Sequence, residues 1–431
     1  MSNIFLDAFT VSLYANSEAL LIVLAGVYAV WHKVVAPPDL KSLSKLLIKV
    51  IFPCLSFSNF QIYSLELLLK WYTAAIVSAL TLVLGYILGY IGGRLLGLKP
   101  PHTQILILST AFGNVGALPY VLVPPIAANW QRVRRDPEAM IKGYGVIAIY
   151  AVVWSIALFG LGQPFARSMQ PKDDVTQIAT SASSAAPSAA PSAPRRHPLR
   201  RALALLLAVE PGVYAALVSI VLGCMAPVRQ LLSPPNGPLL PVGAFTARLG
   251  RAGPPLSTLI LGGTLYLGGA AQLQKRRQAK RALKDAAVAE TAAAPDEGSP
   301  AQPPAEINVE IIDGGRSASS MTRLTIAAIV IKLVLIPAIS IPLLLLAARN
   351  GLLSRDEPML FMVLMLQSAV PSAQTGLALV VAAGLQAEAG QMSMVYLPMY
   401  VLSIFTLAAV IVASITLYDS INPISGNETI S

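Results

Sequence analysis

Apolar residues gather in ten long runs along the chain, and short polar stretches separate these runs. A run of about twenty apolar residues is long enough to cross a lipid bilayer as a helix. We therefore predict an all-α polytopic membrane protein with ten transmembrane helices. The predicted spans cover, in order, residues 9–31, 43–60, 71–96, 105–128, 144–161, 211–228, 254–271, 324–348, a segment that includes 361–376, and 392–417.

The fourth run is interrupted near its middle by the segment FGNVGALPY, which contains Gly113, Asn114, Gly116 and Pro119. Proline removes a backbone donor and clashes with the preceding helical turn, and glycine loosens the backbone further. We therefore predict a helix that is broken at membrane depth. Such a break is tolerated where the freed backbone lines a cavity.

The ninth run has a matching interruption, FMVLMLQSAVPSAQTG, which contains Pro371. Interrupted spans at corresponding places in two halves indicate an inverted-repeat transporter and mark its binding site. The alternative is a pair of ordinary proline kinks, because proline is common in membrane helices. Amide and hydroxyl side chains surround the second interruption: Gln367, Ser368, Ser372, Gln374 and Thr375.

The spans form two sets of five, so the second set is inverted relative to the first. Two linkers divide the chain: one is rich in Ser, Ala and Pro, and the other passes from the basic cluster KRRQAKRALK into an acidic Pro/Ala/Ser stretch. These compositions predict disorder. The predicted divisions are 1–162 (spans one to five), 163–201 (linker), 202–271 (spans six and seven), 272–322 (linker), 323–418 (spans eight to ten) and 419–431 (a non-cytosolic tail).

The composition is typical of a membrane protein and argues against other classes. Only 12% of the residues are charged, whereas a soluble domain has about 25%. The net charge of +10 comes from basic residues in short loops beside apolar spans, which is a topology signal and not a nucleic-acid patch. The two cysteines lie within spans and the three histidines lie near loops, so no disulfide framework or metal-ligand spacing is visible. We expect no enzyme, no metal, no cofactor and no nucleic-acid partner.

Three predicted loops carry most of the positive charge. Lys33 and Lys41 follow the first span, segment 195–201 follows the fifth, and segment 275–284 follows the seventh. Odd-numbered loops lie on one side of the membrane, and the positive-inside rule places that side in the cytosol. Both termini then face the opposite side. Segment 132–142 disagrees because it is basic and follows the fourth span, although two acidic residues partly offset its charge.

The ordered set of motifs resembles the PIN-LIKES proteins of the auxin efflux carrier superfamily. FGNVGALPYVLV resembles that family's GN-L-G-N-x-P motif, and LQSAVPSAQTG resembles its LLQYALPPA segment. PPLSTLILGGTL and KLVLIPAISI resemble its seventh and eighth spans. The likeness covers all ten spans in order. The chain departs from the family at Ala117, where a second Asn is usual, at Lys332, where an Arg is usual, and in having its longest linker after span seven.

This resemblance implies a fold like that of the bile-acid symporters, with spans four and nine crossing at their prolines. A scaffold of spans one, two, six and seven supports a transport domain built from the others, whose movement gives elevator-type alternating access. The family carries auxins, chiefly indole-3-acetate, and PIN-LIKES members lie in the endoplasmic reticulum membrane. We therefore expect an auxin carrier in that membrane, with the plasma membrane second, in contact with lipid and able to form a homodimer.

The interruptions also suit an anionic substrate. Pro119 and Pro371 fit the first turn of the second half-helices, where the missing N–H costs nothing. Each half-helix then points an N-terminus at the crossing, with about half a positive charge and free N–H groups. Asn114 and Gln374 can donate to a carboxylate, although Asn114 can also satisfy the broken backbone. Lys332 can balance the substrate charge, pair with released carbonyls or reach the membrane surface. The predicted substrate-binding residues are Gly113, Asn114, Gly116, Pro119, Lys332, Gln367, Ser368, Pro371, Ser372, Gln374 and Thr375.

Three functions fit the sequence. The preferred one is an auxin-like organic anion carrier. The second is a sodium- or proton-coupled symporter of another organic acid, and the third is a receptor or scaffold that binds a ligand without moving it. The spans hold few acidic groups for cations, which favours uniport or exit driven by the membrane potential, although backbone carbonyls can also bind sodium. Saturable flux separates a carrier from a receptor, and imposed ion gradients separate the two carriers.

Overall fold

Every regular element in the described part of the chain is a helix. The computed structural model describes residues 2–60, 64–169, 211–232, 237–292 and 320–422. Within those ranges the one strand-like contact is an isolated antiparallel bridge between Gly113 and Ser372. The prediction of an all-α protein is confirmed for these residues.

The first half of the chain forms helices joined by short turns, and two of them contain π-helical turns. The fourth apolar run is divided into α6 and α7, as predicted. The elements are α1 (Ser2–Trp31), α2 (Pro37–Leu46), η1 (Leu47–Ile51), α3 (Phe52–Phe60), α4 (Leu65–Lys70), α5 (Tyr72–Leu95), α6 (His102–Ala111), α7 (Ala117–Asn129), α8 (Ala139–Ala157), η2 (Leu158–Gly162) and α9 (Gln163–Arg167).

The second half contains the longest helices, α15 and α20, and a second divided run, α18 and α19. Residues 320–329 are also helical and lead into η3. The elements are α12 (Pro211–Cys224), α13 (Ala226–Leu232), α14 (Leu240–Gly250), α15 (Gly253–Ala292), η3 (Val330–Leu335), α17 (Ile336–Arg349), α18 (Pro358–Ala369), α19 (Gln374–Ala382) and α20 (Gln386–Ile421).

The long apolar helices make this chain a polytopic membrane protein. The helices α12 and α13 are bent by 108° relative to each other, and counted as one they add a span to the six named at the end of this paragraph. The helices α7 and α18 are apolar but shorter. Within the described residues, six stretches are long and apolar enough to cross a membrane by themselves: Leu6–Trp31, Tyr72–Leu95, Ala139–Arg167, Leu240–Gln274, Ser320–Arg349 and Gln386–Ile421.

The helices extend further at both linkers than the sequence predicts. The helical structure continues through α9 to Arg167, whereas the first linker was predicted to begin at Gln163. The helix α15 continues to Ala292, so residues 272–292 are not a disordered linker. Ala, Leu, Arg, Lys and Gln are strong helix formers, which explains why this polar stretch prolongs the helix. The rest of both linkers, 170–201 and 293–319, lies outside the described residues.

Two further boundaries differ from the prediction. The short helix α14 precedes α15 in a stretch for which no element was predicted. The helix α20 ends at Ile421, so the tail begins after that residue and not at 419. The tail from residue 423 onward lies outside the described part of the chain.

Glycines allow α1 and α15 to pack closely. A Cβ atom on Gly26 would lie 2.2 Å from the carbonyl oxygen of Leu259, and a Cβ on Gly262 would lie 2.0 Å from that of Val23. Small residues at helix contacts let membrane helices approach each other in this way. The pair therefore holds α15 in a fixed place beside the site described below.

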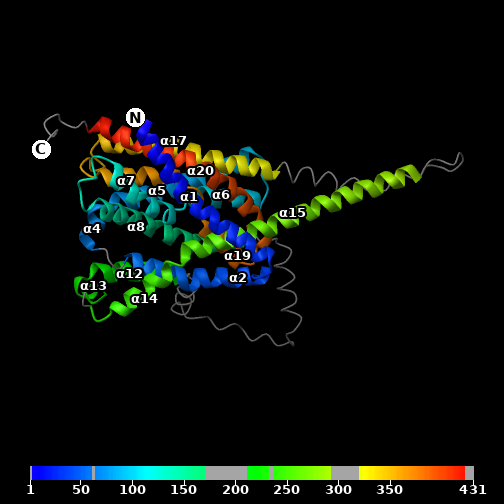
Figure 1. The fold of residues 1–431 in the computed structure, drawn as a ribbon, viewed down its shortest axis with the longest axis horizontal. Helices are drawn as coiled ribbons and strands as arrows, with labels where there is room; N and C mark the ends of the chain where they lie inside the picture. Colours follow the sequence, from blue (N-terminus) through cyan, green and yellow to red (C-terminus); the bar gives the residue numbers. More distant parts are fainter. Residues whose placement is uncertain (1, 61–63, 170–210, 233–236, 293–319, 423–431) are drawn as a thin grey trace, which may run out of the picture.

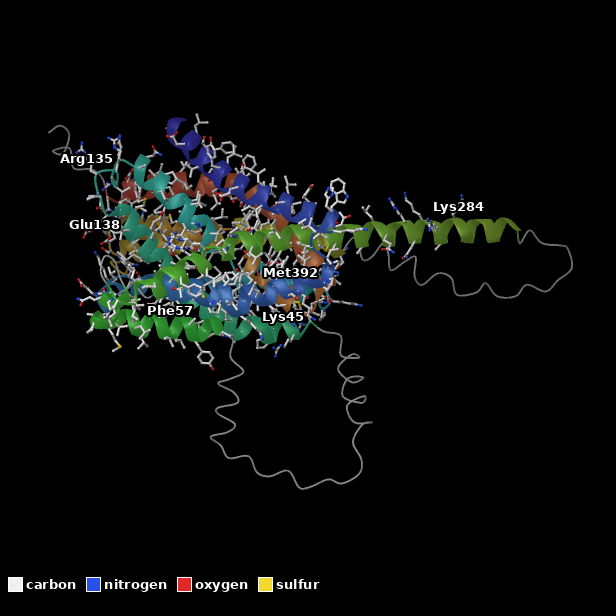
Figure 2. All side chains as sticks on the ribbon, turned by 60° about the horizontal axis from the view of Figure 1, so that its bottom comes forward. Lys45, Phe57, Arg135, Glu138, Lys284 and Met392 are labelled. Carbon is white, nitrogen blue, oxygen red and sulfur yellow. The ribbon has the colours of Figure 1, made fainter. Side chains whose placement is uncertain are left out.

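The helices run side by side in one body, from which the end of α15 projects (Figure 1). The N-terminus and the end of α20 lie together at one end of this body, and α15 leaves it at the opposite end (Figure 1). In Figure 2, Lys284 lies on the projecting part of α15, whereas Arg135 and Glu138 lie at the far end of the body. Segment 275–284 and the N-terminus are therefore at opposite ends, as the predicted topology requires.

Candidate functional site

The two divided runs cross each other at their breaks. Two hydrogen bonds flank the isolated bridge: the Asn114 amide donates to the Pro371 carbonyl at 2.7 Å, and the Ala373 amide donates to the Phe112 carbonyl at 2.8 Å. A helix end leaves backbone groups without intrahelical partners. This pairing supplies partners to some of those groups, so the two breaks stabilise each other.

The first break depends on the residues between α6 and α7. Phe112 is extended, with φ −100° and ψ 100°. Pro119 is the third residue of α7, inside its first turn as predicted, where a proline leaves no hydrogen bond unmade. A Cβ on Gly113 would lie 2.9 Å from Val370 Cγ2 and 3.0 Å from Lys332 Nζ. A larger residue at this position would therefore displace the Val370 or Lys332 side chain.

The second break corrects one sequence prediction. Pro371 does not lie in the first turn of α19, because that helix begins at Gln374 and follows the extended residue Ala373. Pro371 lies in the extended segment between α18 and α19, where its carbonyl accepts the Asn114 amide proton. The crossing uses this segment for pairing with the other break, so the helix starts later than a proline signal suggests.

Tyr400, on α20, fixes the side chain of Asn114. Asn114 Nδ2 donates to the Tyr400 hydroxyl at 2.9 Å, and that hydroxyl donates to the Ser372 carbonyl at 3.0 Å. The Ser372 hydroxyl in turn donates to the Ser109 carbonyl, which belongs to the last turns of α6. Since an amide nitrogen carries two protons, Asn114 keeps a second proton for another acceptor. Both roles predicted for Asn114 are thus compatible with this geometry.

Gln367 and Ser368 use their side chains to satisfy backbone groups. Gln367 Nε2 donates to the Val115 carbonyl at 2.9 Å, within the first break. The Ser368 hydroxyl donates to the Met365 carbonyl at 2.7 Å, one turn earlier on its own helix. Both side chains are buried. Gln367 therefore joins α18 to the first break, whereas the Ser368 hydroxyl bonds within α18.

Lys332 lies in η3 and is buried, with 1% of its surface exposed. Its Nζ donates to the Thr110 carbonyl at 3.2 Å. That carbonyl belongs to the last turn of α6, and the C-terminal end of a helix carries a partial negative charge. The side chain therefore pairs with a released carbonyl, as one of the sequence interpretations proposed, and it does not reach the membrane surface.

A cavity of about 80 Å³, partly open to the outside, lies beside the crossing. Its wall combines the first break, the start of α19, and residues from α3, α8 and α15. The lining residues are Phe52, Leu55, Ser56, Asn114, Val115, Gly116, Ala117, Tyr120, Ala151, Trp154, Ser155, Phe159, Pro254, Ser257, Ala373, Gln374 and Thr375.

The N-termini of two helices meet at this cavity. Ala117 is the first residue of α7, Gln374 is the first residue of α19, and both line the wall. Helix N-termini carry partial positive charge and free N–H groups, which together attract anions. Thr375 and Asn114 add polar side chains to the same wall. This part of the cavity can therefore bind a carboxylate.

Aromatic rings form another part of the wall. Phe52 and Phe159 have ring centroids 5.9 Å apart, and Trp154 packs edge-on against Phe112 with centroids 6.3 Å apart. Aromatic side chains offer large apolar contact areas to a ligand ring. Gly116 also leaves space, because nothing lies within 4 Å of the position that its Cβ would take. The cavity thus joins an anion-binding end to an apolar wall.

The structure brings some of the predicted site residues to the cavity and leaves others behind it. Asn114, Gly116, Gln374 and Thr375 line the cavity. The remaining residues pack in or behind the crossing, outside the lining: Gly113, Pro119, Lys332, Gln367, Ser368, Pro371 and Ser372.

No sequence pattern singles out the aromatic residues of the wall. Phe52, Trp154 and Phe159 lie within apolar runs, where an aromatic residue is as expected in a core or at lipid as in a site. Ser257 lies in the PPLS motif, which the resemblance covers without assigning it a role. Ser257 and Trp154 become visible as site residues only when α8 and α15 are placed against the crossing.

Comparison with known proteins identifies the class to which this fold and site belong. Residues 17–411 match the family described as membrane transport protein, so the chain belongs to this family, the auxin efflux carrier family. Members of the family are transporters and not enzymes, which confirms the expectation that the chain is no enzyme.

Two PIN-LIKES proteins of Arabidopsis thaliana are similar to the chain at low identity. The chain is 21% identical to Protein PIN-LIKES 6 over 379 residues, which cover 79% of this chain and 77% of that protein. It is 24% identical to Protein PIN-LIKES 3 over 286 residues, which cover 61% of this chain and 73% of that protein. The resemblance seen in the motifs is thereby confirmed, and the chain is a membrane transporter of the auxin efflux type.

Proposed function

We propose that the chain carries a small organic anion, an auxin-like carboxylate such as indole-3-acetate, through the cavity beside the crossing. The observation that carries this proposal is the meeting of two helix N-termini with amide side chains on one part of the wall and aromatic rings on another. A planar aromatic acid fits such a wall, because its carboxylate and its ring need different surroundings.

In this proposal Asn114, Gln374 and Thr375 bind the carboxylate. The first residues of α7 and α19 add backbone N–H groups and partial positive charge. Gly113, Pro119, Gln367, Ser368, Pro371 and Ser372 hold the crossing in shape. Lys332 balances negative charge from behind the crossing and does not touch the substrate.

The composition of the cavity wall supports a proposal of alternating access. The wall takes residues from α3 and α15 as well as from α8 and the crossing. We propose ten spans in a five-plus-five inverted repeat, in which α3 and α15 belong to the scaffold. Movement of the crossing against this scaffold then opens the cavity to each side in turn. The membrane is proposed to be that of the endoplasmic reticulum, with the plasma membrane second, and the carrier to form a homodimer.

Uptake of labelled indole-3-acetate into vesicles that contain the purified protein tests this function. The proposal predicts saturable uptake that does not change when sodium or proton gradients are imposed. Uptake that requires such a gradient supports a coupled symporter instead. Binding without flux, in a folded and correctly inserted sample, supports a receptor.

The variants Asn114→Ala and Gln374→Ala test the site. Each removes one donor to a charged acceptor, a bond that contributes about 1.5–3 kcal/mol. We therefore expect each variant to fold and to raise the KM for indole-3-acetate by about tenfold or more. Full uptake with unchanged KM in both variants would place the substrate elsewhere.

A further inference from the structure

The amide group of Gln374 is held from the side by α15. Thr258 Oγ1 lies 2.7 Å from Gln374 Oε1, and Ser257 Oγ lies 3.4 Å from the same atom. All three side chains are buried. This contact joins α15 to the first residue of α19, at the edge of the cavity. Ser257 lines the cavity with Gln374, whereas Thr258 is outside the lining.

The contact distances of the two hydroxyl groups indicate which way the amide points. Each hydroxyl has one proton to donate. Ser257 Oγ lies 2.8 Å from the Pro254 carbonyl oxygen, and Thr258 Oγ1 lies 2.9 Å from the same oxygen. The assignment with the shortest contacts has Ser257 donating to Pro254 and Thr258 donating to Gln374. Gln374 Oε1 therefore accepts a hydrogen bond from Thr258 on α15. The NH₂ group of the same amide is left to donate elsewhere.

We propose that Thr258 is a specificity-determining residue that makes the site select a carboxylate over the corresponding neutral amide. By holding Gln374 Oε1, it keeps the NH₂ group available to the cavity, where that group can only donate. A carboxylate can only accept, so it matches this arrangement. A primary amide can match it with its oxygen alone and gains no charge-assisted bond. The proposal rests on the proposed function of the cavity.

Loss of the Thr258 hydroxyl should relax this selection. Without it, Gln374 is free to turn and to offer either its oxygen or its NH₂ group to a ligand. Thr258 is therefore a positioning residue, since it acts through Gln374. A residue that only packed the helix would weaken both ligands equally and would leave their ratio unchanged.

Equilibrium binding of labelled indole-3-acetate and indole-3-acetamide to the purified full chain measures the ratio directly. Wild type is expected to bind the acid more tightly than the amide. Thr258→Val keeps the shape of the side chain and is expected to reduce the preference by about tenfold. Thr258→Ala serves as a second variant that lacks the hydroxyl. Thr258→Ser restores the hydroxyl and is expected to restore the preference.

Thr264→Val is the matched control on the same helix. Thr264 is also buried, and its hydroxyl contacts the Ile260 and Leu261 carbonyls of its own helix, each at 3.0 Å. This variant should keep the wild-type ratio. If folded Thr258→Val and Thr258→Ala also keep it, the inference is wrong while the carrier function stands. If wild type binds neither ligand, the proposed function itself fails and the inference falls with it.

Discussion

At the scale of single residues, Asn114 joins the first break to α20 through its hydrogen bond with the Tyr400 hydroxyl. A polar amide beside glycine and proline in an apolar run indicated a role at the break, and Asn114 does line the cavity. Its partner Tyr400 carried no such signal, because it lies 286 positions away on another helix. A local pattern cannot show a contact that only packing creates, and the aromatic wall of the cavity was missed for the same reason.

Among the predicted site residues, Lys332 is the one whose interpretation the structure changes most. Its burial and its bond to the Thr110 carbonyl put a positive charge behind the crossing, at the C-terminal end of α6. Carriers with broken helices can hold a cation at such ends, where backbone carbonyls are released. In this chain the Lys332 side chain donates a hydrogen bond to one of these carbonyls, that of Thr110.

Replacing Lys332 with methionine should separate transport from stability. Methionine fills a similar volume, but it leaves the buried Thr110 carbonyl without this donor, and an unsatisfied buried acceptor costs about 1–3 kcal/mol. We expect the variant to remain folded, with a free energy of unfolding lowered by no more than about 3 kcal/mol, and uptake to fall by about tenfold or more because the charge is lost. Thermal unfolding and vesicle uptake measure the two quantities.

Lys49→Met provides the control for this variant. Lys49 also lies in a π-helical turn, η1, but its side chain is exposed. The Lys49→Met variant should therefore leave uptake unchanged. Wild-type uptake by a folded Lys332→Met protein would show that the charge behind the crossing is not needed.

At the scale of elements, the sequence predicted the breaks well because their cause is local. Glycine and proline disturb a helix wherever they occur, and both divided runs are present. The start of α19 depends instead on pairing with the other break, so Pro371 was placed in the wrong part of the segment. The extension of α15 was missed because a charged, alanine-rich composition is shared by linkers and solvated helices.

The close contact of α1 with α15 yields a prediction about stability. Gly262→Ala places a methyl group 2.0 Å from the Val23 carbonyl oxygen, so the two helices must separate. Overpacking of this kind costs about 1–3 kcal/mol, and the midpoint of thermal unfolding should fall. Gly269→Ala, on the same helix, meets no atom within 4 Å and should leave the midpoint unchanged or raise it. Equal midpoints for the two variants would contradict the contact.

At the scale of the whole molecule, ion pairs offset part of the charge of segment 132–142, the basic loop that conflicts with the predicted orientation. Arg132 Nε lies 2.7 Å from Asp419 Oδ1, and Lys142 Nζ lies 2.7 Å from Asp136 Oδ2. The bond from Lys142 lowers the pKa of the Asp136 carboxyl. Two of the basic side chains in this loop are therefore paired with acidic ones, which reduces the charge that opposes the predicted topology.

The cavity is a property of the whole arrangement, since its wall needs α3, α8, α15 and both breaks. Apolar periodicity shows that these helices exist but not which of them meet. The order of the motifs and the family resemblance predicted the crossing. The part of the wall that α15 forms is known only from its packing in the structure. The central claim is therefore that an anion-binding end and an aromatic wall belong to the same cavity.

The most direct test of that claim is an experimental structure of the purified full chain with bound indole-3-acetate. The account predicts ligand density in the cavity, with the carboxylate in hydrogen-bond reach of Asn114 and Gln374 and the ring against Trp154. Density at another site, or a carboxylate turned toward the aromatic wall, would contradict it.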